Sequence, residues 1–289
     1  MRKFIGMKQI PLHRLDAELQ QPKFEVALWK KDISKYDVSL PHRHNYYEVL
    51  VFLKGGGTHE IDFTTYPVKS NSLHFVSANQ VHVVRRLPGS DGFSLLFAEE
   101  FPGPNFQLRE LEFYKPGTPR VLNLSAADFK QFNVLLEEVK KEYFSKNKRK
   151  REVLQSLMQV LLIRAQRCYE QQAGAKQQPL ITQSEFTIKL ERLIEKNYQL
   201  HWRAGDYARA LNMSIIHLNN LCKQHFSKST ESLIQERLML EIKRALVYSN
   251  KAVKEICFEL NFEDPAYFVR FFKKHTGTTP MEYRRSVHE

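Results

Sequence analysis

Cysteine is scarce in this chain, and long apolar runs are missing from it. The three cysteines, Cys168, Cys222 and Cys257, lie far apart and form no C-x-x-C pair. This excludes a zinc ribbon and a dense disulfide framework, so we expect buried, reduced thiols. No apolar run is long enough to span a bilayer, and the basic start "MRKFIGMKQIPLHR" has too short an apolar stretch for a signal peptide. We therefore expect a cytoplasmic protein without a membrane partner.

Several motifs that carry catalysis are also missing. The sequence has no Gly-rich phosphate loop, no Cys nucleophile beside a catalytic His, and no acceptor Asp in a setting typical of receiver domains. Nothing therefore indicates kinase, nucleotide or phosphorelay chemistry. We expect no catalytic residue, no cofactor and no enzyme activity.

Positive charge, by contrast, is in excess. The formal net charge is +12 and the isoelectric point is about 9.5, which suggests a polyanionic partner. Much of the excess lies in "KKEYFSKNKRKRE", residues 140–152. That run is most simply a solvated loop between two helices, so composition alone does not locate a nucleic-acid surface.

The period of the apolar residues divides the chain. Residues 24–122 contain short apolar or alternating runs such as "FEVALW", "YEVLVFL" and "SLHFVS", separated by turn residues. This spacing predicts a β-sandwich or β-barrel. In residues 123–172 the period becomes helical, and Ser125 is the predicted N-cap of the first helix.

The second predicted helix, "REVLQSLMQVLLIRAQRCYEQQ", carries one apolar stripe. The stripe either pairs with a second copy of the chain or packs on its own barrel. The Gln-rich segment 173–181 that follows reads as a linker. The residues of the stripe are Leu154, Leu157, Met158 and Leu161.

An internal repeat marks the C-terminal half. At an offset of fifty residues, "SIIHLNNLCKQHFSKST" aligns with "DPAYFVRFFKKHTGTTP". Ser214 and Asp264 are predicted N-caps, and Pro265 suits the first helical position. Each copy follows a short helix and a turn, so the repeat predicts two helix-turn-helix units. The apolar residues of "STESLIQERLMLEIKRALVYS" occupy more than one face, as a helix packing against both units requires.

The last hundred residues closely resemble the AraC/XylS family of transcription regulators. The resemblance lies in "YARALNMSIIHLNNLCK", "ERLMLEIKRAL" and "VKEICFELNFEDPAYFVRFFKKHTGTTPMEYRR". It implies two helix-turn-helix subdomains joined by a linking helix, each placing one helix in the major groove. The chain departs from the family at Cys257 (usually Ala), Asn261 and Ser227 (usually Gly) and Asn220 (often Arg). Asn also adopts left-handed backbone, so Asn261 is compatible with its turn.

Helical spacing predicts which side chains face DNA. In the second unit, Phe268 and Phe272 should face the core, which leaves Ala266, Arg270 and Lys273 on the opposite side. Arg270 suits a guanine edge and Lys273 a phosphate. Alternatively, Arg270 pairs with a carboxylate such as Glu263. The matching face of the first unit carries Ile216, Asn219, Asn220 and Lys223.

The β half contains "LPHRHNYYEVLVFLKGGG", in which His42, His44 and Glu48 follow the order H-x-H-x-x-x-E. This half resembles the cupin-type sensory domain that commonly precedes the AraC/XylS DNA-binding domain. Metal-binding cupins take ligands from this motif and from a later His, whose place here is held by His82. Such ligands would suit Fe, Mn, Ni or Zn.

The second half of the cupin motif is degraded, because Ala78 and Asn79 replace the usual Pro and Gly. The histidines could instead bond Glu48 or backbone, or line an effector pocket at the barrel mouth. We expect effector binding, without a functional metal, at His42, His44, Glu48 and His82.

Together these features predict an α+β protein. It would comprise a cupin-like β-barrel that senses an effector (1–122), a helical dimerisation segment (123–172), a linker (173–181) and an all-α DNA-binding domain with two helix-turn-helix units (182–289). We predict a transcription regulator controlled by a small-molecule effector in the barrel. Its expected partners are double-stranded DNA, the effector and a second copy, with RNA polymerase as a further candidate. The alternatives are a metal-dependent cupin enzyme fused to a DNA-binding domain, and a constitutive DNA-binding protein whose barrel only dimerises.

Overall fold

The computed structural model describes residues 10–13, 24–29, 40–103, 105–115, 118–172 and 185–288. The predicted linker 173–181 lies outside these residues. The chain separates into two compact units, one spanning Pro11–Gln177 and one containing Gln178–Glu289. In the described parts of both units, no helix is long and apolar enough to cross a membrane.

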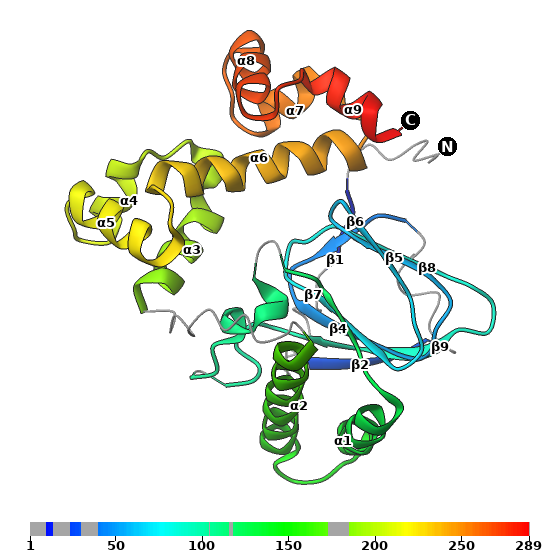
Figure 1. Cartoon of the computed structure of the whole chain (residues 1–289). Helices are drawn as coiled ribbons and strands as arrows, with labels where there is room; N and C mark the ends of the chain where they lie inside the picture. Colours follow the sequence, from blue (N-terminus) through cyan, green and yellow to red (C-terminus); the bar gives the residue numbers. More distant parts are fainter. Residues whose placement is uncertain are drawn as a thin grey trace. The chain divides into compact units, whose positions relative to one another are not determined.

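The first unit is built on antiparallel strands (Figure 1). A five-stranded sheet has the order β10 (Val121–Asn123), β7 (Ser72–Val76), β4 (Tyr47–Lys54), β9 (Asp91–Phe97) and β2 (Phe24–Leu28). A three-stranded sheet has the order β6 (Thr64–Pro67), β5 (Gly57–Ile61) and β8 (His82–Arg86). A short parallel pair joins β1 (Leu12–His13) to β3 (Arg43–His44). The predicted β-rich N-terminal half is confirmed.

Alternation along β4 explains how the layers stack. Successive side chains of a strand point to opposite faces. Leu50 and Phe52 pack with Ile61 and Val84 of the three-stranded sheet. Val49 and Val51 face the other way and join the core beneath the helices.

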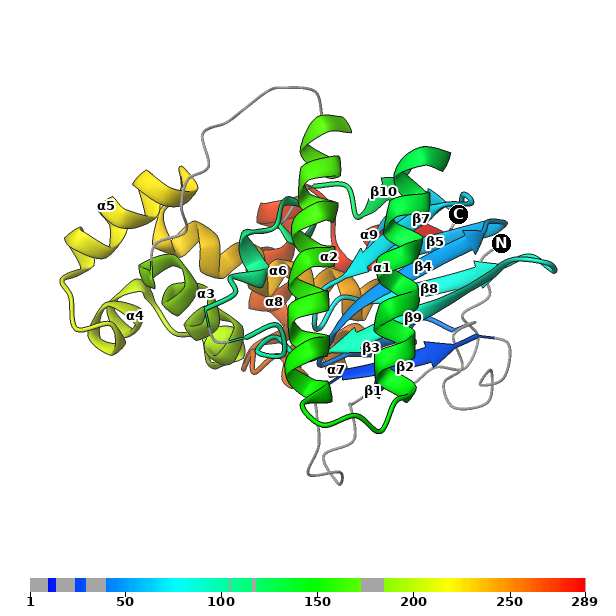
Figure 2. The ribbon, with the colours of Figure 1, turned by 90° about the horizontal axis from the view of Figure 1, so that it is seen from below.

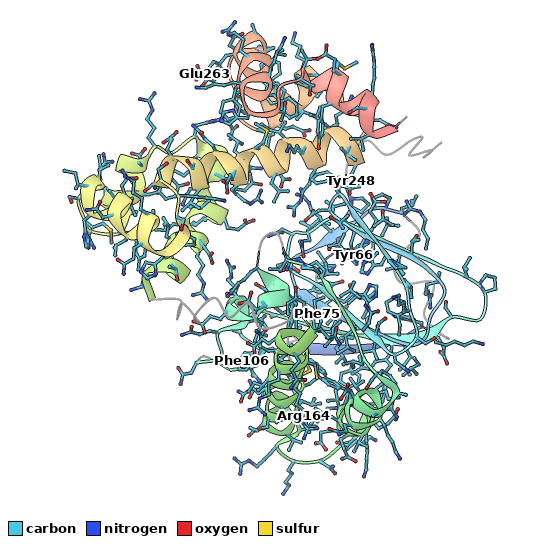
Figure 3. All side chains as sticks on the ribbon, in the orientation of Figure 1. Tyr66, Phe75, Phe106, Arg164, Tyr248 and Glu263 are labelled. Atoms are coloured by element: carbon cyan, nitrogen blue, oxygen red, sulfur yellow. The ribbon has the colours of Figure 1, made fainter. Side chains whose placement is uncertain are left out.

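That second core is covered by α1 (Ala126–Phe144) and α2 (Lys150–Gln172), which lie across the five-stranded sheet in Figure 2. Phe75, labelled in Figure 3, stacks there on Phe113 at 3.8 Å between ring centroids. The predicted N-cap is confirmed, because Ser125 Oγ accepts a hydrogen bond from the backbone N–H of Asp128 at 3.1 Å. The described strands of the first unit and the helices α1 and α2 therefore share one core.

The apolar stripe of α2 faces this core. Leu154, Met158 and Leu161 are at most 1% exposed, and Leu157 is half-buried against them. The stripe thus packs on its own barrel, which is the alternative left open by the sequence. An interface between copies would have to use another face of the helices.

The second unit is entirely helical in its described residues. After α3 (Glu185–Asn197) and the 3-10 turn η3 (Tyr198–Leu200) come α4 (Ala204–Ala210), α5 (Ile215–Phe226), α6 (Thr230–Tyr248), α7 (Val253–Glu259), α8 (Pro265–Thr276) and α9 (Pro280–His288). Helix α6 contributes Ile234 to a core with α3, α4 and α5, and Ile242 and Leu246 to a core with α7 and α8. The prediction that this helix packs against two small bundles is confirmed.

Candidate functional site

Two helix-turn-helix units, α4–α5 and α7–α8, repeat the same local construction. Ser214 caps α5 by accepting a hydrogen bond from the backbone N–H of His217 at 3.1 Å. Asp264 caps α8 by accepting from the N–H groups of Ala266 and Tyr267 at 2.8 and 3.1 Å. The turns contain Asn212 and Asn261 with φ of 53° and 57°, a backbone region that Asn tolerates. Both predicted caps are confirmed.

Helix α8 buries one face and exposes the other as its spacing predicts. Phe268 and Phe272 have no exposed surface, whereas Ala266, Arg270 and Lys273 are exposed. Arg270 lies 3.6 Å from Asp264 and not beside Glu263, the partner that the sequence suggested. An exposed ion pair at this distance contributes little stability, so Arg270 remains available to a ligand.

Helix α5 presents a similar face, on which Asn219 is less exposed than its neighbours. Ile216 is 75% exposed, and Asn220 and Lys223 are also exposed. Asn219, placed on this face by spacing, is half-buried, and its Oδ1 accepts a hydrogen bond from the N–H of Thr230 at 3.1 Å. Asn219 therefore holds the start of α6, and its Oδ1 is engaged within the protein.

In the first unit, strand pairing gathers the predicted effector residues. A backbone bridge joins His42 to His82, and β4 brings Glu48 beside them. His44 Nε2 lies 3.3 Å from Glu48 Oε2, and His82 Nε2 lies 3.6 Å from the same oxygen. None of the four residues is more than 9% exposed. The structure thus brings His82 to the H-x-H-x-x-x-E motif, where the resemblance to cupins had placed it.

The hydrogen bonds of His44 fix what its second nitrogen can do. Its Nδ1 lies 2.7 Å from the carbonyl oxygen of Tyr46, so Nδ1 carries the proton and donates. Nε2 then faces a carboxylate oxygen, and it has no hydrogen-bond partner among the described residues. Two acceptors do not stay together in a buried place without a cation between them, either a proton on Nε2 or a metal ion.

Two further histidines, not singled out in the sequence, extend the cluster. His59 Nε2 lies 3.1 Å from His82 Nδ1, and His59 Nδ1 lies 3.0 Å from His74 Nδ1. If His82 donates through Nδ1, its Nε2 is a lone pair directed at Glu48. Both histidines stand in the apolar runs "THEIDF" and "SLHFVS", but only the structure shows that both rings are fully buried.

Burial sets the charge of these groups. It lowers the pKa of His42 to about 4 and that of His74 to about 3. It also lowers the pKa values of His59 and His82 well below the ordinary value. For Glu48, burial acts to raise the pKa, but the adjacent imidazole of His44 and the hydroxyl of Ser94 outweigh it, and the net shift is downward. Burial thus favours the neutral form of His42, His59, His74 and His82, whereas the surroundings of Glu48 favour its carboxylate.

This donor set fits a metal ion. The ligand atoms of His44, Glu48 and His82 all lie within 4.8 Å of one another. Ligands that bind Zn²⁺ at about 2.0–2.2 Å are about 3.0–3.5 Å apart, close to the observed 3.3 and 3.6 Å. His42 is outside this set, with Nδ1 bonded to the carbonyl oxygen of Leu40 at 2.9 Å. Two imidazoles and a carboxylate suit Fe, Mn, Ni or Zn.

Comparison with known proteins agrees with both units. Residues 207–286 match the model of a helix-turn-helix domain, and residues 34–101 match that of an AraC-like ligand binding domain. An uncharacterized HTH-type transcriptional regulator, YfiF of Bacillus subtilis, is 24% identical over 94% of this chain and 86% of its own length. The HTH-type transcriptional regulator ExsA of Pseudomonas aeruginosa is 26% identical over 35% of this chain and 36% of its own.

Among solved structures, ToxT from Vibrio cholerae is 16% identical over 92% of this chain and 95% of its own, with a TM-score of 0.40. A likeness this distant adds nothing to the assignment, which the two domain matches and the curated relatives carry. The chain belongs to the AraC family of DNA-binding transcription regulators with an N-terminal ligand-binding domain.

Proposed function

We propose that a ligand held at His42, His44, Glu48 and His82 controls how the second unit binds DNA. The observation that carries the proposal is the unsatisfied polar cluster: a buried carboxylate meets two imidazole nitrogens that have no hydrogen-bond partner among the described residues. A bound ligand would satisfy these atoms. Because DNA is the target, we also propose that the protein acts in the cytoplasm.

A panel of small molecules and metal salts tests this proposal. Each compound is scored by thermal shift and by the affinity of the full chain for a DNA duplex selected from a random pool. A ligand of the native state raises Tm by mass action. A hit that acts through this cluster should fail with Glu48→Gln. If no compound shifts both readouts, the chain behaves as a constitutive DNA-binding protein.

A divalent transition metal is a second candidate for the ligand. The separations of 3.3 and 3.6 Å leave space for an ion but not for an organic molecule between the same atoms. His44, Glu48 and His82 would hold the ion, which would supply positive charge to Glu48. This candidate differs from the expectation of no functional metal, and we assign the ion no catalytic step.

We further propose that the protein is a homodimer that uses the outer face of α1 and α2. Five apolar side chains stay exposed there although the inner stripe is covered. A shallow groove lies at the start of α2, and among its lining residues Arg149 and Glu152 form an exposed ion pair at 3.5 Å. Across a twofold axis the two copies could exchange this pair, with Arg149 of each facing Glu152 of the other, because an isologous contact uses the same patch twice. The exposed residues are Val134, Phe144, Val153, Val160 and Ile163.

On DNA, we propose that α5 and α8 each enter the major groove. Arg270 would donate two hydrogen bonds to guanine, Asn220 would read adenine, and Ile216 would contact a thymine methyl. Lys223 and Lys273, later in their helices, would bind phosphate. The two targets would lie about 10 base pairs apart on one face of the duplex.

A further inference from the structure

The two helix-turn-helix units are joined by more than α6. The turn η3 follows α3, which packs in the first bundle through Leu190 and Ile194. Tyr198 of η3 is instead buried in the core of the second bundle. The segment α3–η3 therefore bridges both units beside α6.

Reciprocal hydrogen bonds fasten the end of this bridge to the turn of the second unit. His201 Nε2 donates to the carbonyl oxygen of Leu260 at 2.8 Å. Asn261 Nδ2 donates to the carbonyl oxygen of Gln199 at 3.1 Å. The ring of His201 also meets that of Phe262 edge-on, with centroids 4.5 Å apart. Each of the two segments, 199–201 and 260–261, thus supplies one donor and one acceptor.

Backbone conformation positions both donors. His201 has φ of 51° and Asn261 has φ of 57°, so both are in the left-handed region. At Asn261 the family usually has Gly, which takes up this conformation at no steric cost but has no amide to donate. The structure thus gives this departure from the family a specific contact.

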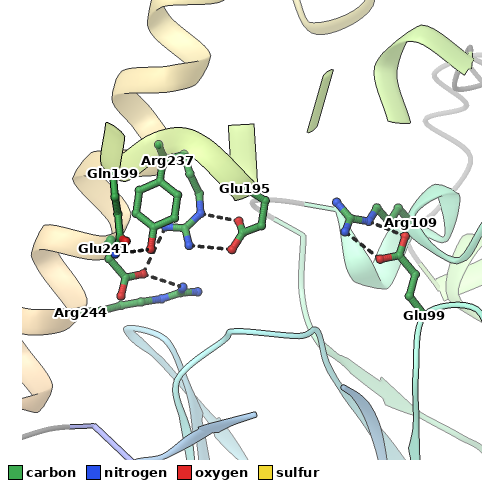
Figure 4. Close-up of polar contacts among 8 residues, drawn as sticks. Glu99, Arg109, Glu195, Gln199, Arg237, Glu241 and Arg244 are labelled. Atoms are coloured by element: carbon green, nitrogen blue, oxygen red, sulfur yellow. Dashed lines mark hydrogen bonds and ion pairs between the residues drawn. The ribbon is translucent and has the colours of Figure 1, made fainter. Parts of the chain in front are cut away.

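An ion-pair network holds the bridge on the middle of α6 (Figure 4). Arg237 binds Glu195 of α3 through two hydrogen bonds of 2.6 and 3.0 Å, and reaches Glu241 at 3.2 Å. Its guanidinium also stacks over the ring of Tyr198 at 3.9 Å. With α3–η3 fixed to α6, the bonds at His201 and Asn261 have a firm support.

We propose that His201 and Asn261 form a clamp that sets the distance and angle between the recognition helices α5 and α8, and so determine operator spacing. The clamp rests on the proposal that both helices contact DNA. It removes motion that α6 alone would leave, and preorganisation of this kind raises affinity only where both units bind at once. The clamp therefore favours one spacing between half-sites.

The test measures the affinity of the full-length protein for a duplex selected by the wild type. The same affinity is measured for duplexes with one base pair inserted or removed between the half-sites, and for each half-site alone. Asn261→Gly keeps the backbone but deletes the amide, and His201→Asn keeps left-handed backbone with too short a side chain. Asn212→Gly is the matched control, because it makes the same change in the first turn, where no side-chain hydrogen bond of Asn212 is found among the described residues.

Each clamp variant should bind the native spacing roughly 2- to 10-fold more weakly, the worth of one hydrogen bond, and should discriminate less against altered spacing. Half-site affinity and the Asn212→Gly control should not change. Wild-type spacing preference in both clamp variants would overturn the clamp alone. A wild-type chain that is indifferent to spacing would overturn the clamp together with the two-half-site proposal.

Discussion

His44 presents Nε2 to Glu48 Oε2 at 3.3 Å while its Nδ1 is bonded to the carbonyl oxygen of Tyr46. This geometry favours binding of a cation between the two side chains, because neither Nε2 nor Oε2 can donate a hydrogen bond to the other without an added proton. His82, whose pKa burial lowers well below its usual value, brings a second imidazole nitrogen to within 3.6 Å of the same oxygen.

Metal binding should therefore be measurable on protein stripped with a chelator. Titration with Co²⁺ should give one equivalent with visible absorption of an N/O site, and Zn²⁺ should displace it. His82→Ala should lose tight binding because one of three ligands is gone. His217→Ala, an exposed residue of the second unit, is the control. Equal Co²⁺ affinity in wild type and His82→Ala would remove the metal candidate.

His59 should increase the metal affinity of that site through its hydrogen bond to His82. His59→Phe deletes the hydrogen bond to His82 Nδ1, and loss of such an outer partner weakens metal binding about 10- to 100-fold. His74→Phe, one ring further away, should have a smaller effect. Calorimetric titration with Zn²⁺ compares the two variants. A larger loss of Zn²⁺ affinity in His74→Phe than in His59→Phe would contradict the proposed sequence of contacts from His82 through His59 to His74.

Much of this molecule could be predicted from local sequence. Ser125, Ser214 and Asp264 cap helices by short-range chemistry, and the burial of Phe268 and Phe272 follows from helical spacing. Local sequence does not show which surface an apolar helix face will pack against. The stripe at Leu157 has the same spacing whether it meets a second copy or its own sheet, and only the packed core decides.

Site residues show the same limit. Spacing alone placed Asn219 on the DNA face, but its contact to Thr230 depends on where α6 begins. The link from His59 to His82 depends on strand register between β5 and β8. The role of Asn261 depends on Gln199, sixty-two positions away in the chain. The motif at His42, by contrast, was visible because three of its members are close in sequence.

Dimerisation should respond to the outer face of α2. Val160→Glu places charge on a side chain that is 40% exposed, so it should weaken an interface without disturbing the monomer core. Leu87→Glu, at a 60% exposed residue before the β8–β9 turn, is the matched control. Sedimentation at micromolar concentration should show a dimer for wild type and control, and a larger monomer fraction for Val160→Glu. A wild-type monomer would rule out the interface.

The network around Arg237 should be needed for stability of the second unit. Arg237→Met leaves Glu241, which is 6% exposed, with less compensation. Breaking a buried ion pair costs about 3–5 kcal/mol. We expect about 2–3 kcal/mol because Glu195 is 34% exposed and solvent screens that part. Urea unfolding measures the change, and Arg209→Met, at an exposed ion pair, should cost less than about 1 kcal/mol. Equal losses would contradict the role of Arg237.

Two further substitutions separate base reading from phosphate binding. Asn220→Ala should relax sequence preference at one half-site, because the contact to adenine is lost. Lys273→Ala should weaken binding to all duplexes by a similar factor and reduce its salt dependence, since one phosphate contact is removed. Binding titrations at two salt concentrations distinguish these outcomes. If Asn220→Ala lowers the affinity for all duplexes by the same factor, Asn220 contacts the DNA backbone and does not read a base.

Arg270 gives the most direct test that the exposed faces of α5 and α8 read DNA sequence. The affinities of wild type and Arg270→Ala are titrated over single-base variants of the selected duplex, at two salt concentrations. We predict that Arg270→Ala loses about 1–3 kcal/mol of discrimination at one guanine and keeps the preferences elsewhere. If Arg270→Ala lowers the affinity for every variant by the same factor, Arg270 does not read a base and the assignment of this face is wrong.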